Sequence, residues 1–374
     1  MKELTWVEVS KEALRHNIGE FRKIVGKDVI LCPCVKANAY GHGLIETGKV
    51  FLESGADWLA VNSLYEAVSL REAKVSSPIY VLGYVPLADL AMVCELDLRI
   101  VVYDKETVEE LGKIGKPVKI HLKIETGNNR QGILMDDLLD FAGFVSEFSN
   151  IEIEGVATHF ANVEDTTDHS YAEKQLEKFN TAIERLEDAG FKIKLKHCAN
   201  SAATILFRET HFNMVRPGIA AYGMWPSKET YISYLKDGGE GFKLMPAFTW
   251  KTRIAQIKTV AAGEYIGYGC TYKTGSEARL AILPIGYYDG YDRCVHGAYV
   301  LIRGKRAYVR GRVCMNIIMV DVSDIDGVEL EDEVVLIGRD GEEFISAEDF
   351  GNFAGTINYE VTTRVNDRIK RIYN

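Results

Sequence analysis

Eight short runs of apolar and β-branched residues recur between residues 29 and 220, and longer segments with helical periodicity separate them. One such segment, residues 170–190, places apolar residues three and four positions apart and ends in a glycine, as amphipathic helices do. The runs occupy residues 29–36, 58–63, 79–84, 99–104, 118–126, 151–159, 194–200 and 213–219. Eight β-α units within about 190 residues favour a closed (β/α)8 barrel of the TIM type over an open sheet.

The pattern changes near residue 240, after the glycine-rich stretch DGGEGF. Later runs such as AFTWKTRIAQIKTV and AYVLIRGKRAYVRGRV are rich in β-branched and aromatic residues, which is typical of strands joined by glycine turns. We therefore expect a barrel domain over residues 1–241 and a mostly β domain over residues 242–374. Residues 1–9 contain the strand-like LTWVEVS, which can instead add a strand to the second domain.

The charge balance argues against polyanionic partners. The 374 residues include 44 Lys and Arg against 54 Asp and Glu, a net charge of −10, and no long basic block occurs. This disfavours nucleic acid and anionic membranes as partners and favours a small molecule. The N-terminus lacks the apolar core of a signal peptide, and no apolar run reaches the ~18 residues that span a bilayer. We expect a cytoplasmic protein.

The cysteines and the common motifs exclude several other classes. Seven scattered cysteines, an odd number, do not describe a disulfide framework, and CPC at 32–34 lacks a second pair to complete a zinc site. We expect free thiols and no metal. The sequence contains no HExxH, GxSxG, GxxxxGK[ST] or GxGxxG motif.

Polar and cationic residues stand where the predicted barrel strands end, which is where barrel enzymes place their chemistry. They are Lys36, Lys123 with Arg130 beyond it, His159, Asn200 with Ser201, and Arg216. Singly, each has a structural explanation: His159 as a hydrogen-bonded core histidine, Arg216 as the partner of a surface carboxylate. Together they predict a ring around an anionic ligand, because buried cations are costly unless they are paired.

Two features indicate that this ligand carries a phosphate and an aldehyde. Ser201 begins the helix-like SAATILF, and RPGIAAYG offers backbone N–H groups at Gly218 and Ile219, an arrangement that suits a phosphate. Lys36 leaves an apolar strand, so its amine suits Schiff-base chemistry with an aldehyde. The structural alternative is a lysine whose stem covers the strand end while its ammonium reaches water.

The motifs VKANAYGHG, RPGIAAYG, GYG at 267–269, IGYYDGY, GRVCMN and INYEV resemble those of the alanine racemases, in order from the first barrel strand to the C-terminus. These are pyridoxal-phosphate enzymes of fold type III, with a barrel and a β domain. The resemblance implies conversion of L-alanine to D-alanine for cell-wall peptidoglycan.

The resemblance also implies roles for individual residues around the cofactor. Lys36 matches the lysine that holds the cofactor as a Schiff base. Arg216 matches the arginine that faces the pyridine nitrogen, with His159 behind it. The positions that match the phosphate ligands are Tyr40, Ser201, Gly218, Ile219 and Tyr359.

A second group of matches concerns the substrate. Arg130 matches the residue that reaches the cofactor phenolate and the substrate carboxylate, and Lys123 matches a lysine that is carbamylated in some members. Tyr268 matches a base supplied by the partner subunit of a homodimer, with Tyr287 and Met315 at the substrate entry. Two bases on opposite faces of a planar carbanion are what racemisation requires, and Lys36 and Tyr268 supply that pair.

The match departs from the family pattern in two places. TGNNR stands where TGMGR is usual, which puts Asn128 and Asn129 before Arg130, and CMN stands where CMD is usual, which puts Asn316 near the substrate. Alanine is therefore the first expectation, with serine or a broader set of small amino acids as alternatives.

Three other functions remain as alternatives. A decarboxylase of the same architecture needs a strong electron sink, and the arginine at position 216 disfavours one because a guanidinium does not give up its proton. A regulatory protein that only binds pyridoxal phosphate needs no more than the barrel, so this hypothesis does not explain the β domain with Tyr268. A barrel aldolase that uses Lys36 alone leaves the phosphate-binding features unexplained.

Overall fold

The computed structural model describes residues 3–374 and divides them into two compact units. The barrel unit comprises residues 13–39 and 44–245, and the β unit comprises residues 3–12, 40–43 and 246–374. The chain therefore contributes three separate segments to the β unit.

The eight predicted runs all contain parallel strands of the barrel unit. They are β2 (Ile30–Leu31), β3 (Leu59–Val61), β4 (Ile79–Val81), β5 (Arg99–Val102), β6 (Val118–Lys123), β7 (Ile151–Ala157), β8 (Leu195–His197) and β9 (Met214–Val215). Strands β3 to β8 pair in chain order, and β2 pairs with β9. A bridge between Cys34 and Ala60 joins the first strand to β3, and Arg216 N donates to Ala199 O at 2.9 Å beyond β8. The (β/α)8 prediction is thereby confirmed.

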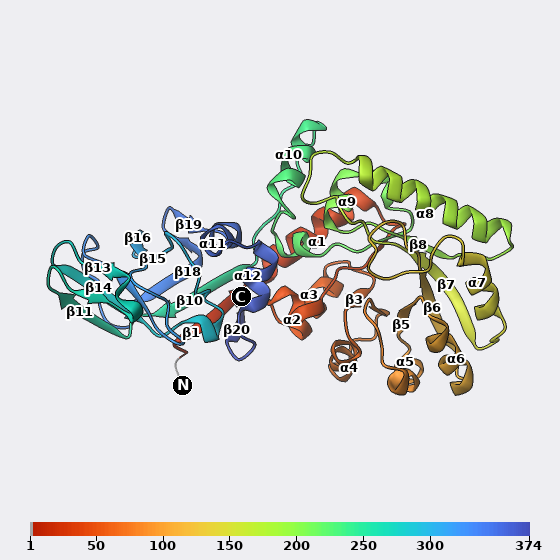
Figure 1. Ribbon diagram of the computed structural model, residues 1–374, viewed down its shortest axis with the longest axis horizontal. Helices are drawn as coiled ribbons and strands as arrows, with labels where there is room; N and C mark the ends of the chain where they lie inside the picture. The colour runs from red at the N-terminus through yellow and green to blue at the C-terminus, as the bar shows by residue number, and fades with distance from the viewer. Residues whose placement is uncertain (1–2) are drawn as a thin grey trace. The chain divides into compact units, whose positions relative to one another are not determined.

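Helices alternate with these strands and cover the outside of the barrel (Figure 1). They are α1 (Lys11–Val25), α3 (Leu44–Glu53), α4 (Leu64–Glu72), α5 (Leu90–Glu95), α6 (Lys105–Ile114), α7 (Leu138–Ser146), α8 (Ser170–Asp188), α9 (Ser201–Leu206) and α10 (Lys228–Lys236). Local signals set their ends: Ser63 and Glu66 form a capping box at α4, and Gly115 ends α6 in the left-handed conformation at φ 68°. Helix α8 buries Phe179, Ile183 and Leu186, which share one face of the helix.

The β unit contains one large sheet and two small ones. The large sheet follows the order β16 (Lys305–Tyr308), β15 (Tyr299–Ile302), β18 (Glu333–Asp340), β10 (Phe248–Arg253), β1 (Thr5–Val9) and β20 (Lys370–Tyr373), with β19 (Glu343–Ile345) also paired to β18. The small sheets are β11 (Gln256–Val260) with β14 (Ala278–Leu283) and β17 (Ile318–Asp321), and β12 (Tyr265–Ile266) with β13 (Tyr272–Lys273). Helices α11 (Ala347–Ala354) and α12 (Asn358–Arg364) precede β20.

Residues from the start of the chain are built into the β unit. Strand β1 pairs antiparallel with β10 and parallel with β20, so the N-terminal strand lies inside the sheet. Residues 40–43 join the same unit because Arg371 Nε donates to Gly41 O at 3.0 Å and Tyr373 Oη donates to His42 O at 2.6 Å. The third segment begins at residue 246, four residues beyond the start that the sequence predicts.

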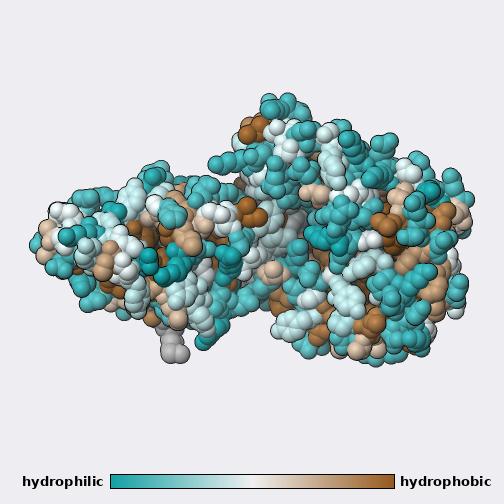
Figure 2. Space-filling view, in the orientation of Figure 1, coloured by the Kyte–Doolittle hydropathy of each residue, from teal (hydrophilic) through white to brown (hydrophobic). Residues whose placement is uncertain are grey.

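The face of the molecule that Figure 2 shows is mostly polar. The visible face of each unit carries hydrophilic side chains with small scattered apolar groups (Figure 2). Among residues 3–374, no helix combines the length and the apolar character needed to cross a membrane.

Gly155 of β7 lies where the barrel wall leaves no room for a side chain. A Cβ atom there would lie 2.8 Å from Leu195 O on β8 and 3.1 Å from His121 Nδ1 on β6. We expect Gly155→Ala to lower the free energy of unfolding by about 1–3 kcal/mol, because neighbouring strands must move apart. Urea denaturation measures this.

Gly143→Ala in α7 is the matched control, because a Cβ at Gly143 would meet no atom within 4 Å. Alanine is the better helix former, so this variant should be neutral or more stable by up to about 1 kcal/mol. Equal destabilisation of both variants would contradict the assigned close contact.

Candidate active site

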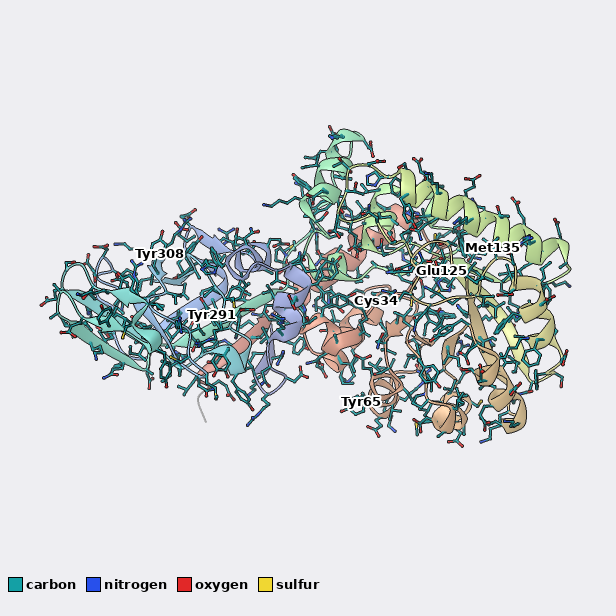
Figure 3. The ribbon with its side chains drawn as sticks, viewed as in Figure 1. Cys34, Tyr65, Glu125, Met135, Tyr291 and Tyr308 are labelled. Carbon is teal, nitrogen blue, oxygen red and sulfur yellow. The ribbon has the colours of Figure 1, made fainter. Side chains whose placement is uncertain are left out.

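Lys36 stands at the carboxyl edge of the barrel. Val35 N donates to Ala60 O at 2.7 Å, so the strand holds the chain up to the residue before Lys36. The Lys36 side chain is partly buried. Cys34 and Glu125, labelled in Figure 3, lie two residues from Lys36 and from Lys123 along the chain.

The four residues after Lys36 form a left-handed turn. Ala37, Asn38, Ala39 and Tyr40 have φ of 53°, 53°, 52° and 52°. Non-glycine residues pay roughly 1–2 kcal/mol each in this conformation. Two hydrogen bonds help to hold the turn: Glu66 Oε1 accepts from Ala37 N at 2.6 Å, and Asn38 Oδ1 accepts from Leu44 N at 2.8 Å. The backbone is therefore strained directly after the lysine, and such strain is common at functional sites.

The predicted cations converge at this edge. Burial and the charges of Arg216 and Arg130 lower the pKa of Lys123 to about 7. Burial lowers the pKa of His159 well below its usual value, and the nearby charges of Lys123, Arg216, Arg130 and Lys36 lower it further. His159 therefore stays neutral at physiological pH.

The four cations share one electrostatic property. Within residues 3–374, no carboxylate forms a salt bridge with Lys36, Lys123, Arg130 or Arg216, although ion pairs occur widely elsewhere in the chain. A pocket of about 170 Å³ adjoins Arg130 and His159, and its lining also includes the acidic residues Glu164 and Asp165. The four cations without carboxylate partners, rather than this pocket, are suited to an anionic ligand.

Arg216 is the most buried of these cations, with 5% of its surface exposed. Its Nη2 donates to Thr158 O at 2.9 Å and to Cys198 O at 3.4 Å, and its Nη1 donates to His197 Nδ1. The histidine bonded to Arg216 is thus His197, and within the described chain no hydrogen bond joins His159 to Arg216.

His197 is not among the residues that the sequence pattern singles out. Its signal is a histidine within the apolar run 194–200, and His121 has the same signal in run 118–126. Which histidine reaches Arg216 depends on the register of the strands, so the pattern alone does not select between them.

Ser201 and the segment after Arg216 form the predicted anion-binding corner. Ser201 Oγ accepts from Gly218 N at 2.7 Å and from Ala220 N at 3.3 Å. Asn200 caps the helix that Ser201 begins, and its Oδ1 accepts from Ala203 N at 3.0 Å. Two backbone N–H groups therefore converge on the Oγ of the buried Ser201, and Ala220 joins Gly218 as a donor that the sequence pattern does not single out.

The remaining predicted residues lie in the β unit. Tyr40 and Tyr359 are neighbours, with ring centroids 6.1 Å apart. Tyr268, Tyr287 and Met315 are exposed by 69%, 41% and 54%.

Residues 312–316 include Met315 and lie next to Tyr287 and to the neighbour of Tyr268. Tyr287 N donates to Cys314 O at 3.1 Å, and a Cβ on Gly269, next to Tyr268, would lie 2.9 Å from Arg312 Nη1. Asn316 Nδ2 lies 3.5 Å from Asp289 Oδ2, where an aspartate would place two like charges together.

Comparisons with known proteins agree along the whole chain. The family models described as "Alanine racemase, N-terminal domain" and "Alanine racemase, C-terminal domain" match residues 9–226 and 247–373. The alanine racemase of Methanococcus maripaludis is 42% identical over 98% of this chain and 98% of its own length. That of Desulforamulus reducens is 42% identical over 100% of both chains.

Solved structures give the same result. The crystal structure of alanine racemase from Bacillus anthracis with bound L-Ala-P has a TM-score of 0.93 and 39% identity, covering 100% of this chain and 96% of that chain. The enzyme from E. faecalis has a TM-score of 0.91 and 33% identity, covering 100% and 98%. With both domains matched by sequence and by fold, the chain belongs to the alanine racemase family.

Proposed function

We propose that the protein interconverts L-alanine and D-alanine with pyridoxal 5'-phosphate as its cofactor. The observation that carries the proposal is the group of four cations without carboxylate partners at the barrel edge, in a chain that matches alanine racemases over both domains. A doubly charged phosphate and a substrate carboxylate supply the missing negative charge. A role in supplying D-alanine for peptidoglycan follows from the family.

The residues present fit this cofactor. Lys36 offers an amine to its aldehyde, and the Gly218 and Ala220 N–H groups already converge on an oxygen atom, as they would on a phosphate oxygen. We assign the phosphate to Ser201, Gly218 and Ile219, with the phenols of Tyr40 and Tyr359 as further ligands. Arg216 is assigned to the pyridine nitrogen and His159 to the same wall of the site.

The residues divide the proton transfer between two faces of the substrate. The cofactor, when bound, withdraws electrons from the α-carbon and so makes its proton removable. Lys36 Nζ takes or returns that proton on one face and Tyr268 Oη does so on the other. Arg130 holds the substrate carboxylate. Arg216 cannot donate a proton to the pyridine nitrogen, which keeps the electron withdrawal weak and favours proton exchange over transamination.

Tyr268 can act as a base only when other groups surround its phenol. A phenol acts as a base only as its phenolate, which neighbouring cations stabilise. Tyr268, Tyr287 and Met315 are all exposed in the single chain. We propose that a second copy of the chain covers them and that each copy lends its Tyr268 to the other's barrel.

Lys123 is suited to carbamylation. Its lowered pKa leaves a large fraction of neutral amine near pH 7, and neutral amines add CO2 to give a carbamate with release of one proton. The anion formed would lie near Arg130 and Arg216, the two cations that lower the pKa of this lysine. We propose that the carbamate orients Arg130 toward the substrate.

The function is tested by a chiral assay of the purified protein with added pyridoxal phosphate. Starting from either enantiomer of alanine, we expect equal amounts of both at equilibrium. Lys36→Ala should lose both the interconversion and the visible absorption of the bound cofactor. Serine is the second candidate substrate, because Asn316 stands where the family has an aspartate. Release of CO2 from the amino acid, without interconversion, would point to a decarboxylase instead.

The role of Tyr268 gives a second prediction. Tyr268→Phe should slow exchange of the α-proton of L-alanine in deuterated water by about 100-fold or more, the usual range for loss of a general base, while cofactor absorption persists. Tyr265→Phe, at another exposed tyrosine three residues earlier, should exchange normally. Mixing Lys36→Ala chains with Tyr268→Phe chains should restore activity in part. Undiminished exchange in Tyr268→Phe would refute the assignment.

Carbamylation of Lys123 gives a third prediction. In ¹³C-bicarbonate, the cofactor-loaded protein should show a carbamate signal in the ¹³C NMR spectrum that grows from pH 6 to pH 8. The signal grows with pH because the neutral amine is the form that reacts. It becomes the major form as the pH rises above the lowered pKa of about 7. Lys123→Met should abolish the signal and Lys178→Met, at an exposed lysine of α8, should retain it. A signal that survives in Lys123→Met would place the carbamate elsewhere.

A further inference from the structure

A series of buried, hydrogen-bonded side chains connects Arg216 to the carboxylate of Glu154 inside the barrel. His197 of β8 accepts a hydrogen bond from Arg216, and its Nε2 lies 2.7 Å from Nδ1 of His121 on β6. His121 Nε2 in turn lies 3.2 Å from Glu154 Oε2 on β7. Both rings are fully buried, and Glu154 is 6% exposed. Nothing in the proposed proton transfer uses His121, His197 or Glu154.

Arg216, His197, His121 and Glu154 form what we call the relay. The guanidinium of Arg216 sets the direction of every hydrogen bond in it. A guanidinium only donates, so His197 Nδ1 must accept and must carry no proton. His197 then carries its proton on Nε2 and donates to His121 Nδ1. His121 Nδ1 must therefore also be free of a proton, so its own proton is on Nε2 and points to Glu154. All donors point from Arg216 toward the carboxylate.

The electrostatics agree with this order. Burial and the charge of Arg216 lower the pKa of His197 well below its usual value, and burial also lowers that of His121. Burial raises the pKa of Glu154, but its interaction with His121, the charge of Arg99 and its hydrogen bond to Lys119 outweigh this, and the net shift is well downward. The two rings are neutral and the last acceptor is ionised.

The carboxylate at the end of the relay is itself anchored. Arg99 Nε lies 3.5 Å from Glu154 Oε2, and Lys119 Nζ lies 3.3 Å from Glu154 Oε1. Arg216 has no carboxylate in contact, so within the described chain Glu154 is the negative charge that reaches it through hydrogen bonds.

The surrounding wall is shaped to hold the two rings. The pairing of β6 with β7 shifts register between Ile120 and His121, which leaves Glu154 as an extra residue on β7, and such bulges re-aim the side chains of the bulged strand. Gly155 leaves space for His121, since a Cβ there would lie 3.1 Å from Nδ1. The ring of Tyr80 packs against both imidazoles, with centroids 4.7 Å from His121 and 5.3 Å from His197. The rings are confined as well as bonded.

We propose that Glu154 is a positioning residue for Arg216, acting through His121 and His197, both of which are held as Nε2–H tautomers. The relay fixes the plane of the guanidinium and keeps its Nη1 turned toward the barrel wall. This inference rests on the proposed function, in which Arg216 faces the pyridine nitrogen of the cofactor. Loss of the carboxylate should loosen the guanidinium and affect turnover more than substrate binding.

The tautomers are tested directly by ¹⁵N NMR of histidine-labelled protein without cofactor. The expected spectrum shows His121 and His197 neutral, each with its proton on Nε2. Glu154→Gln should shift the ¹⁵N resonances of His197 although the two residues do not touch. Glu152→Gln, which removes an exposed carboxylate two residues away on β7 that pairs with Lys194, should not. A proton on Nδ1 of either ring would overturn the proposal, whether or not the protein racemises alanine.

The connection to Arg216 is tested by a double-mutant cycle on the cofactor-loaded protein. Glu154→Gln alone should lower kcat by about tenfold with KM changed less than about twofold, which is the lower end of the loss seen when the outer partners of metal ligands are removed. In an Arg216→Lys background, the same substitution should lower kcat by less than about twofold, because the relay no longer has a guanidinium to hold. Glu152→Gln should leave kcat unchanged in both backgrounds.

Each outcome of the cycle is informative. Equal losses from Glu154→Gln in both backgrounds would show that Glu154 acts by a route other than Arg216, and would overturn the proposal. If the variant melts at a much lower temperature than the parent, the tautomers of the unsubstituted protein still decide the question. A failure of racemisation in the parent protein would overturn the proposed function while leaving the relay itself measurable.

Discussion

Uncompensated positive charge at the carboxyl edge of the barrel is the constraint on which the site depends. A buried cation costs several kcal/mol unless charge or hydrogen bonds compensate it. Arg216 is 5% exposed, yet it is held by two backbone carbonyls and a neutral histidine instead of a carboxylate. Such contacts satisfy the guanidinium hydrogen bonds but leave its charge available to a ligand. Burial lowers the pKa of Lys123 and of His159, and the same excess of positive charge lowers both further.

Close packing and hydrogen bonds within the barrel hold this arrangement in one geometry. Gly155 leaves room for His121 beside the bulge at Glu154 of β7, and the ring of Tyr80 packs against that of His121. The left-handed turn after Lys36 is strained, and two hydrogen bonds hold it: Ala37 N donates to Glu66, and Leu44 N donates to Asn38. Rigid supports of this kind keep reactive groups in one geometry, which proton transfer on two faces of one carbon requires.

Much of the architecture could be predicted because its signals are local. The alternation of apolar runs and amphipathic segments predicts all eight barrel strands, and Lys123 and Arg216 stand directly at strand ends. The relay behind Arg216 could not be predicted in this way. His121 and His197 are single histidines in apolar runs, and their partnership depends on the pairing of β6, β7 and β8 and on a shift of one residue between Ile120 and His121.

Neighbouring residues are enough to predict the barrel, the change to a β-rich region near residue 240, and the lysine that leaves the first strand, since periodicity and strand ends are local properties. Three features emerge only in the folded chain: residues 3–12 and 40–43 join the β unit, the pKa of Lys123 falls to about 7, and two imidazoles connect Arg216 to Glu154. Hydrogen bonds, burial and electrostatic fields arise between residues that are far apart in the chain, and their strength depends on distances that folding sets.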